Sequence, residues 1–289
     1  MNIIMDKTEY IEGFIKTCKE LGVNKGDIIY ISSDVTHLTL DAVRKCAIKG
    51  KSGMDEFYGQ FVDALQAMVG EEGTLLIPMF TWSFCRGIPY DVKNTPGEVG
   101  ALGNWILNNR PDFSRTQHPL YSFMVWGRDA DKLKAMHNRT AWGQDSPFAY
   151  LHREGGKNLI IDVSLGGSFT FLHYVEQTIG VPHRYYKDFH GEFVDENGNK
   201  ELRTYTMFVR DLDIESRQVT PDDCLVEAGV AKKSEYGPST VQLVNLNDAF
   251  GFVEDDLKNN NGSNWYDFMG YKLNWEAGQT HPDETTMEI

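Results

Sequence analysis

The chain has 289 residues, of which 41% are hydrophobic and 24% charged, and its formal net charge is −14. This is the composition of a globular protein long enough to bury a sizeable core. The acidic balance argues against a nucleic-acid-binding protein, which normally carries a basic face. No apolar run approaches the roughly 20 residues of a membrane-spanning helix, and the first residues lack the apolar core of a signal peptide. We therefore expect a cytoplasmic protein with neither nucleic acid nor membrane as a partner.

The cysteines and the spacing of the histidines argue against structural cross-links. The four cysteines are far apart and include no C-x-x-C pair, which disfavours disulfide bonds and zinc sites. Histidines and carboxylates do not recur at the spacing of metal ligands, so we expect no metal ion. The four cysteines are Cys18, Cys46, Cys85 and Cys224.

The first half of the chain alternates predicted helices and strands. Apolar side chains recur at helical spacing in the first helix, and Gly22 is suited to end it. Ser52 is predicted to cap the second helix, with Asp55 as its capping-box partner. The predicted elements of this half are helices over residues 9–21, 52–69 and 95–109 and strands over residues 27–32, 74–79 and 121–126.

The second half continues the same alternation. Ser146 followed by Pro147 is a strong helix start, because Pro is favoured at the first helical position. The predicted elements of this half are helices from residues 146, 170, 221 and 247 and strands over residues 159–163, 203–209 and 240–244. Such alternation predicts an α/β sandwich around a central sheet. Several connections are too short for full crossovers, which favours a mixed sheet.

A polar stretch at residues 259–263 divides the chain into a body and a tail. We expect a single domain over residues 1–260, and an aromatic extension with a disordered acidic end over residues 261–289. The aromatic side chains of this extension are expected to pack on the body or on a neighbouring subunit, which leaves a homodimer open. They are Trp265, Tyr266, Phe268, Tyr271 and Trp275.

His173 is the first candidate for chemistry. It lies just inside a predicted helix that follows the strand over residues 159–163, and α/β proteins place active sites at such strand ends. Gly166 and Gly167 allow the intervening loop a wide range of backbone angles. Glu176 lies three residues further on the same helix face, where it could orient the imidazole ring. An ordinary half-buried histidine satisfied by Glu176 is the alternative.

Three further positions offer weaker signals. His118 precedes a predicted strand in a loop made rigid by Pro119, and it could instead bind backbone carbonyls. Thr81 follows the strand over residues 74–79 and could donate its hydroxyl to an oxyanion. Ser32 and Ser33 end the first strand, where hydroxyls and free amides could hold ligand amides or a phosphate. A polar strand end is common, so these positions remain open.

Several enzyme classes lack their motifs in this sequence. There is no G-x-S-x-G, so a hydrolase triad on an α/β-hydrolase fold is poorly supported. Neither G-x-x-x-x-G-K-[ST] nor a G-x-G-x-x-G that follows a strand is present, which disfavours a nucleoside triphosphatase and a dinucleotide-binding enzyme.

Four segments, in order, resemble the aminoglycoside 3-N-acetyltransferase family. A weaker fifth match covers residues 225–257, and the resemblance extends from about residue 10 to residue 260. The segments are LGVNKGDIIYISS at 21–33, GTLLIPMFTW at 73–82, GALG with RTQHPLYS and WG at 100–127, and GQDSP with SFTFLHYVE at 143–176.

The resemblance implies an α/β/α sandwich with a central mixed sheet. It implies direct acyl transfer from acetyl-CoA or a longer acyl-CoA to the amine of an amino sugar, with a histidine as general base. His173 matches that histidine, and Thr81 matches a hydroxyl near the thioester carbonyl. The positions that match residues around the cofactor and the cleft are Ser32, Ser33, His118 and Ser122.

The acid that orients the histidine is not identified by the resemblance. In the family it lies some way after the histidine, near a strand, and the matching region of this chain is residues 201–213. Asp211 and Asp213 are the candidates there, and Glu176 is the local rival.

Two departures from the family pattern bear on the acceptor. Residues 36–51 form an insertion with four basic side chains, either a solvated loop or a clamp for phosphates. Residues 185–190 are rich in aromatic side chains that could stack on a base or a sugar. We therefore place a nucleotide-linked 3-amino-3,6-dideoxyhexose narrowly ahead of an aminoglycoside antibiotic as acceptor. A non-enzymatic, ligand-binding relative is the third hypothesis. The basic residues of the insertion are Arg44, Lys45, Lys49 and Lys51.

Overall fold

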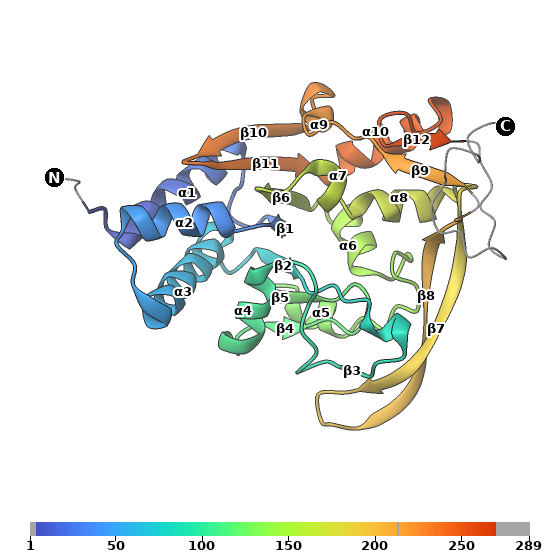
Figure 1. Cartoon of the computed structure of the whole chain (residues 1–289), viewed down its shortest axis with the longest axis horizontal. Coiled ribbons are helices and arrows are strands. Elements are labelled where there is room, and N and C mark those ends of the chain that lie inside the picture. Colours follow the sequence, from blue (N-terminus) through green and yellow to red (C-terminus); the bar gives the residue numbers. More distant parts are fainter. Residues whose placement is uncertain (1–3, 213, 270–289) are drawn as a thin grey trace, which may run out of the picture.

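A mixed seven-stranded sheet forms the centre of the protein. The computed structural model describes residues 4–212 and 214–269. The strand order is β10-β11-β6-β1-β2-β5-β4 (Figure 1). The strands are β1 (Ile28–Ser33), β2 (Thr74–Pro78), β4 (Ser114–Arg115), β5 (Phe123–Gly127), β6 (Lys157–Ile161), β10 (Ala231–Tyr236) and β11 (Ser239–Asn245).

The three central strands are parallel and the outer ones antiparallel. Strand β1 pairs in parallel with β2 and with β6. On either side β5 pairs antiparallel with β2, and β11 pairs antiparallel with β6. Parallel partners need long crossovers and antiparallel neighbours do not, which explains why the short connections of the sequence occur at the flanks. The predicted mixed sheet is confirmed.

Strand β1 shows how the sheet separates two cores. Its side chains alternate between the faces, so that Ile29 and Ile31 join one buried cluster and Ile28 and Tyr30 the other. A continuous apolar run is expected for a strand that is covered on both faces. The helices that cover the two faces complete the α/β/α sandwich predicted above.

The first core lies under helices from the first part of the chain. Their buried side chains, such as Phe14 and Phe61, pack against one face of the sheet. These helices are α1 (Lys7–Leu21), α2 (Thr36–Lys45), α3 (Gly50–Val69) and α4 (Ala101–Asn109).

The second core lies under helices that come mostly from the second part. Phe148, Phe171 and Val253 are among the side chains that they bury. The helices of this part are α5 (Ala130–Lys134), α6 (Pro147–Arg153), α7 (Leu165–Ser168), α8 (Phe171–Ile179), α9 (Cys224–Glu227) and α10 (Leu246–Asn259). Of the helices in the described ranges, 4–212 and 214–269, none combines the length and the apolar character needed to cross a membrane.

Two smaller sheets lie against this body. Strands β7 (Arg184–Val194) and β8 (Lys200–Arg210) form a long antiparallel ribbon, which β3 (Tyr90–Asp91) joins after the short helix η1 (Ser83–Arg86). Figure 1 shows this ribbon curving along the side of the body that lies away from α1–α3. Strands β9 (Glu215–Gln218) and β12 (Tyr266–Met269) form a second ribbon. Of these strands, only β8 is predicted from the sequence.

Helix starts were predicted with mixed success. Ser146 caps α6 as predicted and accepts a hydrogen bond from the Ala149 amide at 3.2 Å. The predicted capping box of Ser52 is wrong, because α3 already begins at Gly50 after Lys49. The carboxylate of Asp55 instead accepts a hydrogen bond from the indole of Trp105 on α4, at 3.1 Å. A tertiary contact thus replaces the expected local one.

Two segments have other structures than expected. Residues 36–51 are mostly helical rather than a loop: residues 36–45 form α2, residues 46–49 are a short connection, and α3 begins at residue 50. The predicted helix start at residue 95 is also wrong, since α4 begins at Ala101. Residues 95–98 turn back toward the sheet instead, where the amide of Glu98 donates to the carbonyl of Phe80 at 2.7 Å. This turn carries Glu98 to the edge of a pocket.

Residues 261–269 pack on the body, as the aromatic side chains suggested. Trp265 is fully buried, and Tyr266 is buried where β12 begins. The predicted boundary at residue 260 therefore falls inside the packed structure. Tyr271, Trp275 and the predicted acidic tail lie outside the described residues.

Candidate active site

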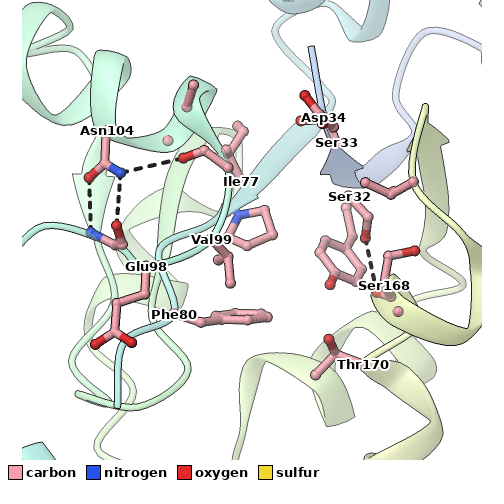
Figure 2. Close-up of a pocket in the computed structure, with 18 of the residues that line it drawn as sticks. Ser32, Ser33, Asp34, Ile77, Phe80, Glu98, Val99, Asn104, Ser168 and Thr170 are labelled. Carbon is pink, nitrogen blue, oxygen red and sulfur yellow. Dashed lines mark hydrogen bonds between the residues drawn. The ribbon is translucent and has the colours of Figure 1, made fainter. Parts of the chain in front are cut away.

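A pocket of about 540 Å³ lies where the parallel strands β1, β2 and β6 end (Figure 2). Ligands of open α/β sheets bind outside the carboxyl ends of the strands. The ends of β1 and β2 and the residues that follow them form its floor. The start of α4 with the loop before it forms one wall, and the end of α7 with Thr170 forms the other. Its lining includes Ser32, Ser33, Asp34, Ile77, Phe80, Glu98, Val99, Asn104, Ser168 and Thr170.

The pocket combines neutral polar groups with an apolar surface. On one wall the hydroxyl of Ser32 lies 3.2 Å from Asn158 Oδ1 and 3.5 Å from the carbonyl of Ser168. On the other wall Asn104 holds the loop before α4, because its amide group exchanges hydrogen bonds of 2.9 and 2.8 Å with the backbone of Gly97. Such a lining suits a ligand that carries amides and short apolar groups.

Gly103 allows the α4 wall to lie close to the sheet. A Cβ atom at this position would lie 2.6 Å from the carbonyl oxygen of Pro78 and 2.7 Å from the Met79 sulfur. Only glycine permits this approach, which brings the first turn of α4 against the end of β2. The width of the pocket therefore depends on this residue.

The charged side chains in the lining of the pocket are carboxylates. Asp34 and Glu98 lie on its rim, and within residues 4–212 and 214–269 no Lys, Arg or His lines it. Hydrogen bonds from Thr36 lower the pKa of Asp34, and the hydrogen bond from Thr81 lowers that of Glu98. Both are therefore ionised at neutral pH. Arg86, which is exposed, offsets part of the charge of Glu98 at 3.2 Å.

His173 and Glu176 form a close pair on α8. His173 Nδ1 lies 2.7 Å from Glu176 Oε2. The imidazole packs against the ring of Trp142, with 5.1 Å between ring centroids, and the side chain keeps 27% of its surface exposed. The i, i+3 spacing of a helix places the two groups on one face. The ring is thus held on one edge and open on the other.

The carboxylate of Glu176 is fully buried and has four partners. Besides His173 these are His183 Nε2 at 3.0 Å, Arg184 Nε at 2.8 Å and the Tyr266 hydroxyl at 2.8 Å. Burial opposes ionisation, but the hydrogen bonds from His173 and His183 and the positive charge of Arg184 outweigh it. They hold the pKa of Glu176 well below its ordinary value. Glu176 is therefore an anion inside the core.

The same environment keeps His173 neutral. Burial and the positive charge of Arg184 lower its pKa, while Glu176 acts in the opposite direction. An ionised carboxylate can only accept a hydrogen bond, so Nδ1 of His173 carries the proton. The lone pair is then on Nε2, on the edge of the ring away from Glu176. This is the form that a general base requires.

Aromatic rings connect His173 with the pocket. Trp142 contacts Tyr121, with centroids 4.7 Å apart, and Tyr121 contacts Phe80 at 4.9 Å. Phe80 lines the pocket, as does Thr170, which lies three residues before His173. The pocket and the imidazole therefore belong to one continuous region at the start of α8.

The comparisons with known proteins agree on one family. The profile of the family described as aminoglycoside 3-N-acetyltransferase matches residues 46–258, more than half of the chain. The chain belongs to the aminoglycoside 3-N-acetyltransferase family. As a member it is an N-acyltransferase that depends on acyl-CoA.

Individual relatives are more distant. The chain is 24% identical over 234 residues to the SPbeta prophage-derived aminoglycoside N(3')-acetyltransferase-like protein YokD of Bacillus subtilis (strain 168), covering 70% of this chain and 80% of YokD. Among solved structures, AAC-IIIb binary with CoASH has a TM-score of 0.66 at 20% identity, covering 89% of this chain and 97% of that one. AAC-VIa bound to sisomicin has a TM-score of 0.67 at 21% identity, covering 88% and 97%. These structures share the fold of this family member.

The structure brings only some of the predicted site residues to the pocket. Ser32 and Ser33 line it. His118 and Ser122 do not: both are buried and have backbone partners, and the Ser122 hydroxyl donates to the carbonyl of Met79 at 3.0 Å. His118 Nδ1 accepts weak hydrogen bonds from the amides of Leu120 and Tyr121, and burial lowers its pKa to about 3. These two predicted cofactor contacts therefore lie in the supporting structure.

Thr81 lies beside the pocket rather than in its lining. Its hydroxyl donates to Glu98 Oε1 at 2.8 Å, so that Thr81 would have to release Glu98 in order to donate to an oxyanion. Of the candidate acids, Glu176 contacts His173. Asp211 follows β8, and its amide donates to the carbonyl of His183 at 2.9 Å. Asp213 lies outside the described residues.

Three residues of the site were missed by the sequence analysis. His183 and Arg184 lie at the start of β7, and Tyr266 lies in the extension. The pair His183-Arg184 after Pro182 is a local concentration of cationic groups, and it is the only signal in the sequence for two of them. Nothing local to Tyr266 indicates a contact with a residue 90 positions earlier.

Proposed function

We propose that this family member transfers an acyl group from acyl-CoA to an amino group of an aminoglycoside, with His173 as general base. The observation that carries the proposal is the contact of 2.7 Å between His173 Nδ1 and the buried, ionised Glu176. A neutral imidazole oriented by a carboxylate is suited to remove a proton from an attacking amine. Glu176 takes the part of the orienting acid in this proposal.

The chemical step is a direct transfer. Nε2 of His173 removes a proton from the acceptor amine as its nitrogen attacks the thioester carbonyl. A C–N bond forms, the C–S bond of the tetrahedral intermediate breaks, and the CoA thiolate leaves and takes up the proton. Glu176 stabilises the imidazolium that forms in between, because the charge develops 2.7 Å from its carboxylate.

The lining of the pocket supports the pantetheine arm of acyl-CoA as its ligand. Pantetheine has two amide groups and an apolar dimethyl carbon, which match hydroxyls such as those of Ser33 and Ser168 beside Val99 and Val163. With the arm in this pocket, a thioester near Phe80 and Thr170 would lie at the start of the helix that carries His173. The family relative AAC-IIIb has been solved with CoASH.

The charge of the pocket supports a polycationic acceptor. Asp34 and Glu98 are ionised on its rim, where their negative charges suit the ammonium groups of a polycation. A net charge of −14 also attracts cations over a distance. The relative AAC-VIa has been solved with sisomicin bound, which agrees with this order. An aminoglycoside therefore replaces the nucleotide-linked sugar as the first candidate acceptor.

The features that favoured a nucleotide-linked sugar lie elsewhere. Thr36, the first residue of α2, lines the pocket. Arg44 and Lys45 lie at the opposite end of this helix, roughly 13 Å from Thr36 at a rise of 1.5 Å per residue. Lys45 is paired with Asp41 at 2.7 Å. Tyr185 and Tyr186 are exposed on β7 and are not among the residues that line the pocket.

A thiol assay tests the proposal. Release of CoA from acetyl-CoA is followed with a panel of aminoglycosides, with dTDP- and UDP-linked amino sugars, and without acceptor. We expect release that depends on aminoglycosides. Release with nucleotide sugars alone would reverse the order of the two acceptors. If no acceptor stimulates CoA release, with acetyl-CoA or with longer acyl-CoAs, the proposal is contradicted.

A further inference from the structure

We propose that Tyr266 is a positioning residue for the His173–Glu176 pair, supplied by a segment that follows the residues matched by the family profile. The family match ends at residue 258, and Tyr266 begins β12 eight residues later. Its hydroxyl donates to Glu176 Oε1 at 2.8 Å. The inference rests on the proposed role of His173 as base.

The position of Tyr266 is fixed on several sides. Its ring packs against His183, with centroids 5.3 Å apart, and its oxygen receives a hydrogen bond from Arg184 at 3.3 Å. The preceding Trp265 is fully buried and stacks on Phe169, which lies two residues before α8. Strand β12 pairs with β9. The hydroxyl therefore reaches Glu176 from a backbone that is itself anchored to the body.

The two oxygens of Glu176 have separate partners. Oε2 faces His173 and Arg184, whereas Oε1 faces His183 and Tyr266. A carboxylate can rotate about its last bond, so donors that hold Oε1 also set the direction of Oε2. The proton of Tyr266 is committed to Oε1, because its own oxygen accepts a hydrogen bond from Arg184. It thereby keeps Oε2 aligned with His173 Nδ1.

Loss of this hydroxyl should alter the titration of His173. The ionisable groups that face the imidazole are Glu176 on α8, His183 and Arg184 at the start of β7, and through Glu176 the hydroxyl of Tyr266 on β12. Without the Tyr266 hydroxyl, Oε1 keeps only the contact with His183, and more of the negative charge of Glu176 acts on His173. The imidazolium becomes more stable, and the pKa of His173 rises.

The test compares Tyr266→Phe with two matched variants in the full chain. Tyr236→Phe removes another tyrosine hydroxyl, which is half-buried and donates to the carbonyl of Tyr10 on α1. Trp265→Phe weakens the packing of the same segment and leaves the hydroxyl in place. For each variant kcat/KM is measured against pH with the best acceptor, together with the KM for acyl-CoA and the melting temperature.

We expect kcat of Tyr266→Phe to fall about tenfold, which corresponds to one hydrogen bond to a charged group. On the acidic side of the kcat/KM profile, the pH at which activity is half lost should rise by about half a unit or more, since each pH unit equals a tenfold change in proton affinity. KM for acyl-CoA should stay unchanged. Tyr236→Phe and Trp265→Phe should keep the pH profile of the wild type, whatever their melting temperatures.

Two results would overturn the inference. One is a Tyr266→Phe profile that coincides with the wild type. The other is a loss of activity that Trp265→Phe reproduces in proportion to its loss of stability, without a pH shift in either. His173→Asn in the same assay separates the two proposals. If it retains activity, the base is wrong. If it is inactive while Tyr266→Phe is unaffected, only the role of Tyr266 fails.

Discussion

Arg184 Nε lies 2.8 Å from Glu176 Oε2, the same oxygen that lies 2.7 Å from His173 Nδ1. The buried carboxylate of Glu176 therefore contacts a permanent cation and the imidazole with the same oxygen. Without Arg184, a buried anion beside a histidine would favour the imidazolium, which cannot act as a base. With Arg184 the carboxylate still orients the ring, but its charge is largely neutralised. This balance underlies the first two predictions.

His173→Asn should leave the fold and the binding of CoA intact. The rate of transfer should fall by about 10²–10⁴, the usual contribution of a general base. Steady-state kinetics by the thiol assay and a binding measurement with CoA check this result. His190→Asn is the matched control, because His190 is an exposed histidine on β7 whose partner is Thr204. Activity of His173→Asn within a few-fold of the wild type would remove His173 from the mechanism.

Arg184→Met should move the acid limb of kcat/KM to higher pH. The base is active only while His173 is unprotonated, and the charge of Arg184 lowers the pKa of His173. Removal of that charge raises this pKa, so activity is lost at a higher pH as the medium is acidified. The ratio of the rates at pH 6 and pH 8 is the readout, and it should fall. A ratio equal to that of the wild type would show that Arg184 does not tune the base.

The same substitution should also cost stability. It leaves the buried carboxylate of Glu176 without its cation, a change that typically costs about 3–5 kcal/mol in the free energy of unfolding. Unfolding in denaturant measures this cost, and the double variant Arg184→Met with Glu176→Gln should recover part of it. The rate ratio is therefore compared at a temperature at which all variants are folded.

Asp34→Asn should weaken the binding of a polycationic acceptor. Asn keeps the side-chain oxygen that receives the Thr36 amide at 2.9 Å, so the start of α2 should be retained. Loss of the charge should raise the KM for an aminoglycoside about five-fold, equivalent to about 1 kcal/mol for a partly exposed pair. The KM for acyl-CoA should not rise, and the effect should shrink at high salt. Glu20→Gln on the exposed face of α1 controls for the change in net charge. An unchanged KM at low salt would count against Asp34 as an acceptor contact.

Gly103→Ala should destabilise the wall of the pocket. Its Cβ would meet the Pro78 carbonyl oxygen at 2.6 Å, and overpacking of this kind costs about 1–3 kcal/mol. Gly59→Ala on α3 is the matched control, because the nearest atom to its Cβ belongs to Trp105 at 3.9 Å. Alanine there should stabilise the helix by about 0.5–1 kcal/mol. Thermal unfolding compares the two, and equal melting temperatures would contradict the close approach of α4 to β2.

Much of the fold follows from local patterns in the sequence. The apolar run of β1, the helical spacing of Tyr10, Phe14 and Cys18 in α1, and the Ser146-Pro147 start of α6 each predict their element correctly. These signals work because a buried strand or a helix face must show its periodicity within a few residues. Strand β7 shows no such pattern, because most of its side chains are exposed or half-buried. The sequence analysis therefore missed it.

The site also has features that the sequence predicts and features that only the tertiary structure shows. The sequence by itself determined the contact of His173 with Glu176, because two residues three apart on a helix must share a face. Only the tertiary structure decided the charge of that pair, since His183, Arg184 and Tyr266 reach Glu176 from β7 and β12. It also decided that Ser32 lines the pocket while His118 and Ser122 are buried away from its lining. Burial and long-range contacts set these outcomes, and neither is encoded in the spacing of neighbouring residues.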